Sequence, residues 1–352
     1  MAAIELSKPK DENKVNRLLS VRIAITKIAS SLLMVAGGGA IGREGPTIQI
    51  AASVFTVVNK WIPASWSKLS KQSFILTGAA AGLAAAFNTP LGGVVFAMEE
   101  LARTHIRFFR TAIFSAVIIA GLTAQGLLGT YLYLGYPQVS GLTTSIFFGV
   151  ALTAIVAGIA GSLMGKAILN VMKWKKIFST AKTILFILIA GLVIATIAYF
   201  FNENVLGSGK DQMNRLLFTN DKTSSWHTML LRIAGPVIAF NTGAAGGVFA
   251  PSLAAGAVVG SFVATIFDIA GSNANILILA GMVGFLTGVT RTPFTSAILV
   301  LEMTDRHSVI FHLMLAALVS NVVALLVDRN SFYDHLKKSY VEQTLSPQVN
   351  ET

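Results

Sequence analysis

The chain has 352 residues, of which 54% are hydrophobic and 12% are charged, and its mean hydropathy is +0.69. Soluble domains carry about 25% charged residues, so this composition excludes an ordinary soluble domain. The net charge is +11, and the chain has no cysteine, which excludes disulfides and thiolate chemistry.

The basic residues gather in short polar stretches, at 8–22, 60–71, 103–110, 166–182 and 337–338. Cytoplasmic loops of membrane proteins carry an excess of Lys and Arg, so we expect these stretches to mark the lipid interface. A basic vestibule that attracts an anionic substrate is the alternative. Nucleic-acid binding is disfavoured, because the stretches lack interleaved aromatic residues and a soluble binding fold.

The first segment in chain order is residues 1–19. It is charged, has only a partly helical pattern and lacks the apolar core of a signal peptide. Residues 28–42 are apolar but interrupted by glycine, and residues 233–257 are apolar but interrupted by glycine and proline. Such interrupted segments are expected where helices enter a membrane and stop partway.

Three apolar runs carry no charge, at residues 111–135, 144–165 and 183–201. Each is long enough to cross a bilayer, because about 20 apolar residues span it as a helix. The sequence therefore predicts an all-α polytopic membrane protein. We expect a single transmembrane domain over residues 1–352 that ends in a polar tail from 341, with no cytoplasmic regulatory domain.

Two pairs of segments match each other at nearly the same spacing. Residues 77–100 align with residues 280–303 at an offset of 203, which takes Pro90 to Pro293 and Glu99 to Glu302. The segment GGGAIGREGPTIQIAA at 37–52 aligns with TGAAGGVFAPSLAAGA at an offset of 205. Glycine-rich membrane helices resemble one another, but two matches at one spacing favour a duplicated unit. We expect halves at about 1–170 and 180–340, and the repeat alone leaves a parallel or an inverted relation open.

Each Gly-rich motif is followed by a proline, which favours the first turn of a helix, so we expect helices to begin near Pro46 and Pro251. Helix starts carry unpaired N–H groups and a partial positive charge, which together suit an anion. Glu44 lies just before one start, so its carboxylate can take the anion's place when ionised and leave it when protonated. A helix-capping acid paired to Arg43 is the alternative interpretation. Ionisable residues within a membrane are usually functional, which favours the first interpretation of Glu44.

Two further motifs are weak. Gly37, Gly39 and Gly42 match the dinucleotide fingerprint G-x-G-x-x-G, and residues 207–210 read GSGK. The fingerprint needs a preceding strand and a later acid, and GSGK lacks the spacing of a phosphate loop, so a nucleotide-binding enzyme is disfavoured. The histidines show no metal-ligand spacing, and we expect no metal and no cofactor, with interfacial positions for His105, His227, His307, His312 and His335.

The segments GREGP, GGVFAP, FNTPLGGVVFAMEE and TRTPFTSAILVLEMTD together resemble the CLC family of chloride channels and proton/chloride exchangers. The resemblance runs in order from about Val21 to Tyr333. It implies two inverted-topology halves with broken, re-entrant helices, and homodimers in which each subunit has its own anion path. It also implies that chloride and protons are the transported ions and that the protein is no enzyme.

By this resemblance, Glu44 matches the gating glutamate and Glu100 matches the inner proton relay of the exchangers. The same resemblance assigns anion binding to the hydroxyl of Tyr333 and to backbone N–H groups, those of Arg43, Glu44, Gly45, Val248, Phe249 and Ala250.

Exchange of chloride for protons is therefore the expected function, and an uncoupled channel or an inactive fragment of either is the alternative. For the pair Glu99 and Glu100, the structural alternative is that they end a helix at the polar interface and form a salt bridge with Arg103. Glu302 occupies the position of Glu99 in the second repeat, so we expect Glu99 and Glu302 to be structural.

One departure concerns the anion. Family members carry a GSGIP segment upstream of GREGP whose serine faces the central anion, and we find no match to it. We therefore expect a chain that lacks its first helices, with its anion preference open. The short tail after Tyr333 resembles prokaryotic members, which indicates a bacterial inner membrane.

Overall fold

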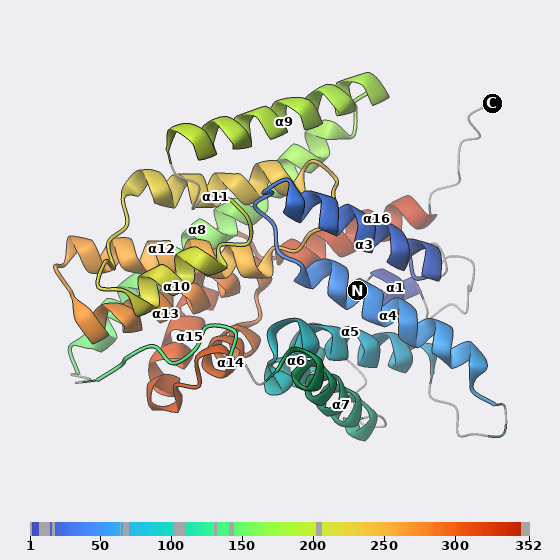
Figure 1. The fold of residues 1–352 in the computed structure, drawn as a ribbon, viewed down its shortest axis with the longest axis horizontal. Helices are drawn as coiled ribbons and strands as arrows, with labels where there is room; N and C mark the ends of the chain where they lie inside the picture. Colours follow the sequence, from blue (N-terminus) through green and yellow to red (C-terminus); the bar gives the residue numbers. More distant parts are fainter. Residues whose placement is uncertain are drawn as a thin grey trace.

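The computed structural model describes residues 2–6, 15, 18–63, 65, 70–101, 110–129, 132–140, 144–201 and 206–345. Within these residues the regular structure is helical, and the one backbone bridge is isolated, so the all-α prediction is confirmed (Figure 1).

The helices fall into two sets that the repeat relates. The first set is α3 (Val21–Ala36), α4 (Glu44–Trp61), α5 (Lys71–Phe87), α6 (Pro90–Phe96) with the π-helix η1 (Ala97–Leu101), and α7 (Arg110–Leu128). The second set is α11 (Trp226–Phe240), α12 (Phe249–Ile266), α13 (Gly271–Thr290), α14 (Pro293–Thr304), the 3-10 turn η3 (His307–Val309) and α15 (Ile310–Val327).

Five further helices lie outside this pairing: α1 (Ala2–Leu6), α8 (Ile146–Lys175), α9 (Thr180–Phe200), α10 (Lys210–Phe218) and α16 (Phe332–Leu345). The long helix α8 packs on α13 and α15, whereas α9 lies at the outer edge of the molecule beside α11 (Figure 1).

Six helical segments are long and apolar enough to cross a membrane, which supports a multi-pass membrane protein. They are Thr111–Leu128, Ile146–Lys175, Thr180–Phe200, Phe249–Ile266, Gly271–Thr290 and His307–Val327. The first three fall on the charge-free runs that the sequence indicated.

The core of the molecule is the contact between α12 and α13, both of which are almost entirely buried. Gly256 and Gly281 meet there, and a Cβ atom added to either would collide with the backbone carbonyl of the other. Small residues allow membrane helices to approach this closely, so this contact is made backbone to backbone.

Glu99 and Glu302 tie the two sets together by the same contact made in both directions. Glu302 Oε1 and Oε2 accept from the N–H groups of Leu91 (3.0 Å) and Gly92 (2.6 Å), at the start of α6. Glu99 accepts from the start of α14 in return, from Phe294 N (3.2 Å), Thr295 N (2.7 Å) and Thr295 Oγ1 (2.8 Å). Each carboxylate thus caps a helix of the other repeat, which is the relation expected of a two-fold axis, and the structural interpretation of both residues is confirmed. Arg103, the alternative partner, lies outside the described residues.

Candidate anion and proton site

Two repeat-related glycines join the Gly-rich motifs. Gly42 N donates to Gly247 O at 2.8 Å, and Gly247 N donates to Gly42 O at 2.7 Å, which makes an antiparallel bridge. A Cβ added to Gly45 would lie 2.9 Å from Gly246 O, so glycine is required for this approach. The bridge places the starts of α4 and α12 side by side, since each helix begins two residues after its bridging glycine.

Neither of these helix starts is capped by a side chain, in contrast to the starts of four other helices. Ser20, Ser70, Ser179 and Ser225 precede α3, α5, α9 and α11, and each accepts a backbone N–H through its side chain. The residues before α4 and α12 are Arg43 and Val248, and neither supplies a side-chain cap. First-turn N–H groups are therefore left for an acceptor that comes from elsewhere. The predicted starts near Pro46 and Pro251 were two residues late, because proline is tolerated throughout the first turn, where its missing N–H has no intrahelical partner.

The Glu44 carboxylate fills this junction. The side chain is 1% exposed and lies against the backbone N–H groups of Arg43, Glu44 and Ala250. Ala250 belongs to α12, so the acid contacts the helix starts of both repeats. A Cβ added to Gly42 would collide with Glu44 Oε2, and one on Gly247 would lie 3.2 Å from it. Glycines on both sides therefore leave room for a carboxylate or an anion of similar size.

A cavity of about 560 Å³ opens from this junction, and Gly45, Phe249, Tyr333 and Glu100 all line it. The Tyr333 ring lies 6.0 Å from that of Phe249. Tyr333 is also within electrostatic range of both Glu44 and Glu100. Glu100 is 1% exposed and lies on the π-helix η1, a local form that recurs at functional sites. One cavity therefore brings together Glu100 and Tyr333, and at Gly45 and Phe249 it reaches the two helix starts that the Glu44 carboxylate contacts.

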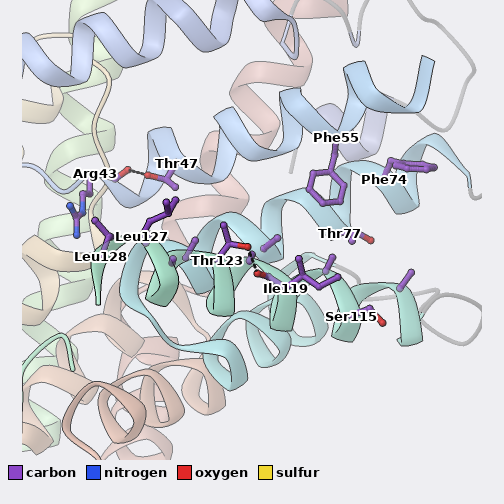
Figure 2. A pocket seen from close by; sticks show the side chains of 17 residues that line it. Arg43, Thr47, Phe55, Phe74, Thr77, Ser115, Ile119, Thr123, Leu127 and Leu128 are labelled. Carbon is purple, nitrogen blue, oxygen red and sulfur yellow. Dashed lines mark hydrogen bonds between the residues drawn. The ribbon is translucent and has the colours of Figure 1, made fainter. Parts of the chain in front are cut away.

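The other predicted positions lie at the two helix starts. Val248 and Ala250 are buried before and within the first turn of α12. Only the backbone of Arg43 belongs to this junction, because its side chain lies in a different groove, between α4, α5 and α7 (Figure 2).

The cavity also has cationic residues at its wall that sequence reasoning did not place there: Arg22, Lys27 and Lys337. Arg22 and Lys337 belong to the polar stretches that were expected at the lipid interface, so the vestibule alternative is the better description of these two. Lys27 belongs to none of those stretches. Its spacing of five from Arg22 along α3 corresponds to about 140° around the helix axis, so the sequence carried no signal that the two residues line one cavity. Ala2, Ala3 and Ile4 of α1 line the same cavity.

His312 is packed between helices. It is 4% exposed, and its ring stacks on that of Phe147 at 4.2 Å, because α15 packs on the start of α8 there. The interfacial position expected of it stays a prediction. The G-x-G-x-x-G segment follows helix α3 rather than a strand, so it lacks the setting of a dinucleotide site. Among the described residues, no three acidic or histidine side chains are grouped as metal ligands; His105 lies outside them.

These features define a polytopic membrane protein with a duplicated core and a shared site at two helix starts. The family model described as voltage gated chloride channel matches residues 3–325, and the chain therefore belongs to this family, the CLC family.

Solved structures share the fold. A slow cyanobacterial Cl⁻/H⁺ antiporter superposes with a TM-score of 0.80 at 23% identity, over 92% of this chain and 77% of that one. A CLC-type fluoride/proton antiporter gives 0.73 at 19% identity, over 95% of this chain and 91% of that one. A eukaryotic CLC transporter gives 0.78 at 18% identity, over 96% of this chain and 60% of that one.

Proposed function

We propose that the protein exchanges chloride for protons across a membrane, with Glu44 as the gate and Glu100 as the inner proton relay. The observation that carries this proposal is the position of the Glu44 carboxylate against N–H groups of both α4 and α12. An ionised carboxylate there competes with chloride for the same donors. Protonation removes its charge and lets the anion enter, which couples the two ions.

The anion is held in this proposal by backbone N–H groups of Arg43, Glu44 and Gly45 and of Val248, Phe249 and Ala250, with the Tyr333 hydroxyl as a further donor. None of these donors carries a full charge. Partial charges suit a transported ion, which must bind and also leave.

The proton passes between two acids in this scheme. Glu100 exchanges its proton at the wall of the 560 Å³ cavity, and Glu44 exchanges the proton at the helix junction. Tyr333 lies within electrostatic range of both acids, which supports a path along its side of the cavity. We further propose a homodimer in a bacterial inner membrane, with lipid around it.

Exchange is tested by reconstituting the chain in liposomes, imposing a chloride gradient and recording internal pH. We expect protons to move against their own gradient. The Glu100→Gln variant is expected to keep chloride flux and lose proton movement. Glu342→Gln is the matched control, because it removes an exposed carboxylate on α16.

An uncoupled channel is the second candidate, since the description of the family model names channels. In a channel, Glu100→Gln leaves both the chloride flux and its independence of protons unchanged. If neither the unmodified chain nor the Glu100→Gln variant shows chloride flux in liposomes, the chain is an inactive fragment.

A further inference from the structure

The turn between α8 and α9 carries positive charge that no nearby acid of the chain balances. Residues 144–201 contain five lysines and no Asp or Glu. One of the five, Lys166, lies within electrostatic range of Asp328. The other four take no part in an ion pair among the described residues; they are Lys173, Lys175, Lys176 and Lys182. A surface of this kind attracts an anion from outside the chain.

Two of these lysines lie beside Phe186 of α9. Lys175, in the last turn of α8, donates from Nζ to the carbonyl of Asn241 at the end of α11, and this Nζ lies 4.6 Å from the centre of the Phe186 ring. Lys182 is one helical turn before Phe186, so these two side chains emerge on the same face of α9. An ammonium group has three N–H donors. Lys175 is therefore held in place at the junction of three helices and still has donors for an anion.

The aromatic side chains at this turn indicate its depth in the membrane. The ring centres of Trp174 and Phe178 are 4.5 Å apart, and they lie 6.5 Å and 6.4 Å from that of Phe186. The Trp174 residue is 55% exposed. Exposed tryptophan is typical of the interface between membrane and water, where lipid phosphates lie. Lys175 follows Trp174 directly and is therefore at the level of the lipid head groups.

Beyond Lys182, α9 presents an apolar surface to the membrane. This helix lies at the outer edge of the molecule, and 6% of the span Thr180–Phe200 is buried (Figure 1). Leu185 and Ile189 follow Lys182 at spacings of three and seven, so the three residues share one face of α9. The leucine is 56% exposed and the isoleucine 51%. A ligand with a phosphate and acyl chains covers both the lysine and this apolar face, whereas a soluble anion would leave the apolar face uncovered.

We propose that the junction of α8, α9 and α11 binds one anionic glycerophospholipid. Its phosphate bridges Lys175 and Lys182, and its acyl chains lie along Leu185 and Ile189. Basic stretches mark the lipid interface in general, whereas here two lysines from different helices bind a single phosphate. The binding is independent of ion exchange, so its test needs no measurement of transport.

The test measures lipid binding to the purified full chain in a neutral detergent by native mass spectrometry. The probe is dioleoyl phosphatidylglycerol. Dioleoyl phosphatidylcholine has the same acyl chains without a net charge, and glycerol 3-phosphate has the charge without acyl chains. We expect one phosphatidylglycerol per chain, bound about tenfold more tightly than either of the other two, because both the charge and the apolar face contribute.

Lys182→Gln should weaken the binding of phosphatidylglycerol about fivefold, since each lysine near a membrane surface attracts anionic lipid by about that factor. Lys173→Gln is the matched control. Lys173 is exposed and belongs to the same stretch, but it lies about 200° around α8 from Lys175 and so faces away from the junction. Its loss should change the affinity less than about twofold. Lys175→Gln also removes the bond to Asn241, so Lys182→Gln is the decisive variant.

Binding should also raise the thermal midpoint of the unmodified chain, and Lys182→Gln should reduce that rise. Equal weakening by Lys173→Gln and Lys182→Gln would show a diffuse attraction to a basic surface. Equal binding of phosphatidylcholine would show that charge is not recognised, and equal binding of glycerol 3-phosphate would show that the ligand is a soluble anion. Each of these results, or a chain that retains no lipid, overturns the proposal.

Discussion

Gly42 and Gly247 occupy equivalent positions in the two repeats and hydrogen-bond to each other through both of their backbone groups. This bridge brings the two repeats together at the candidate site, because α4 and α12 each begin two residues after its glycines. The Glu44 carboxylate lies within the junction that the bridge creates.

Gly247→Ala should disturb this junction. The added Cβ would lie 2.6 Å from Gly45 N, so the two helix starts must separate. We expect a loss of about 1–3 kcal/mol of stability, as for other overpacked sites, together with a loss of chloride flux. Thermal unfolding in detergent and flux in liposomes measure the two effects. Gly191→Ala is the control, because no atom lies within 4 Å of its added Cβ, and it should leave both quantities intact.

Glu44→Gln should separate anion movement from protons. The amide resembles the protonated acid in shape and cannot release a proton, so chloride flux should persist and lose its dependence on pH. Chloride flux measured from pH 4 to pH 8 tests this, with Glu342→Gln as the control. A variant that still drives chloride with a pH gradient would show that Glu44 is not the gate.

Glu302→Ala should cost stability through the start of α6. Its carboxylate accepts from Leu91 N and Gly92 N, and losing a helix cap costs about 0.5–2 kcal/mol. Glu99→Ala should cost a similar amount at α14. Denaturant unfolding of the two single variants and the double variant checks this. If the Glu302→Ala protein keeps its stability but loses proton coupling, a purely structural role for Glu302 is contradicted.

Lys27→Gln should weaken chloride entry through the cavity that Glu100 and Tyr333 line, because Lys27 lies at its wall with Arg22 and Lys337. Cationic clefts concentrate anions, so chloride flux at low ionic strength should fall about two- to tenfold. The deficit should shrink at about 1 M of an impermeant salt, where the Debye length is near 3 Å. Lys338→Gln is the matched control, since this residue is exposed and outside the cavity wall. A deficit that is the same at both salt concentrations would indicate a structural effect of Lys27.

Much of the architecture could be predicted from local pattern. The charge-free runs became α7, α8 and α9, because the length and polarity of a segment decide whether it can cross a bilayer. The repeat was visible because duplication preserves spacing, and Gly42 was already paired with Gly247 in the alignment. The starts of α4 and α12 followed from the Gly-Pro motifs to within two residues.

Which helix faces pack against each other could not be predicted in this way, because a lipid-facing helix and a buried helix have the same apolar sequence pattern. His312 and α9 illustrate the two outcomes: the histidine is buried against Phe147, whereas α9 is almost entirely exposed. The lining of the cavity by Lys27 and the packing of α8 on α13 are of the same kind. Sequence by itself determined a duplicated helical membrane protein with an acid at a helix start, because those features are local or periodic. Only the tertiary structure decided that both helix starts share one carboxylate and that one repeat has an open groove, because these depend on contacts between segments about 200 residues apart.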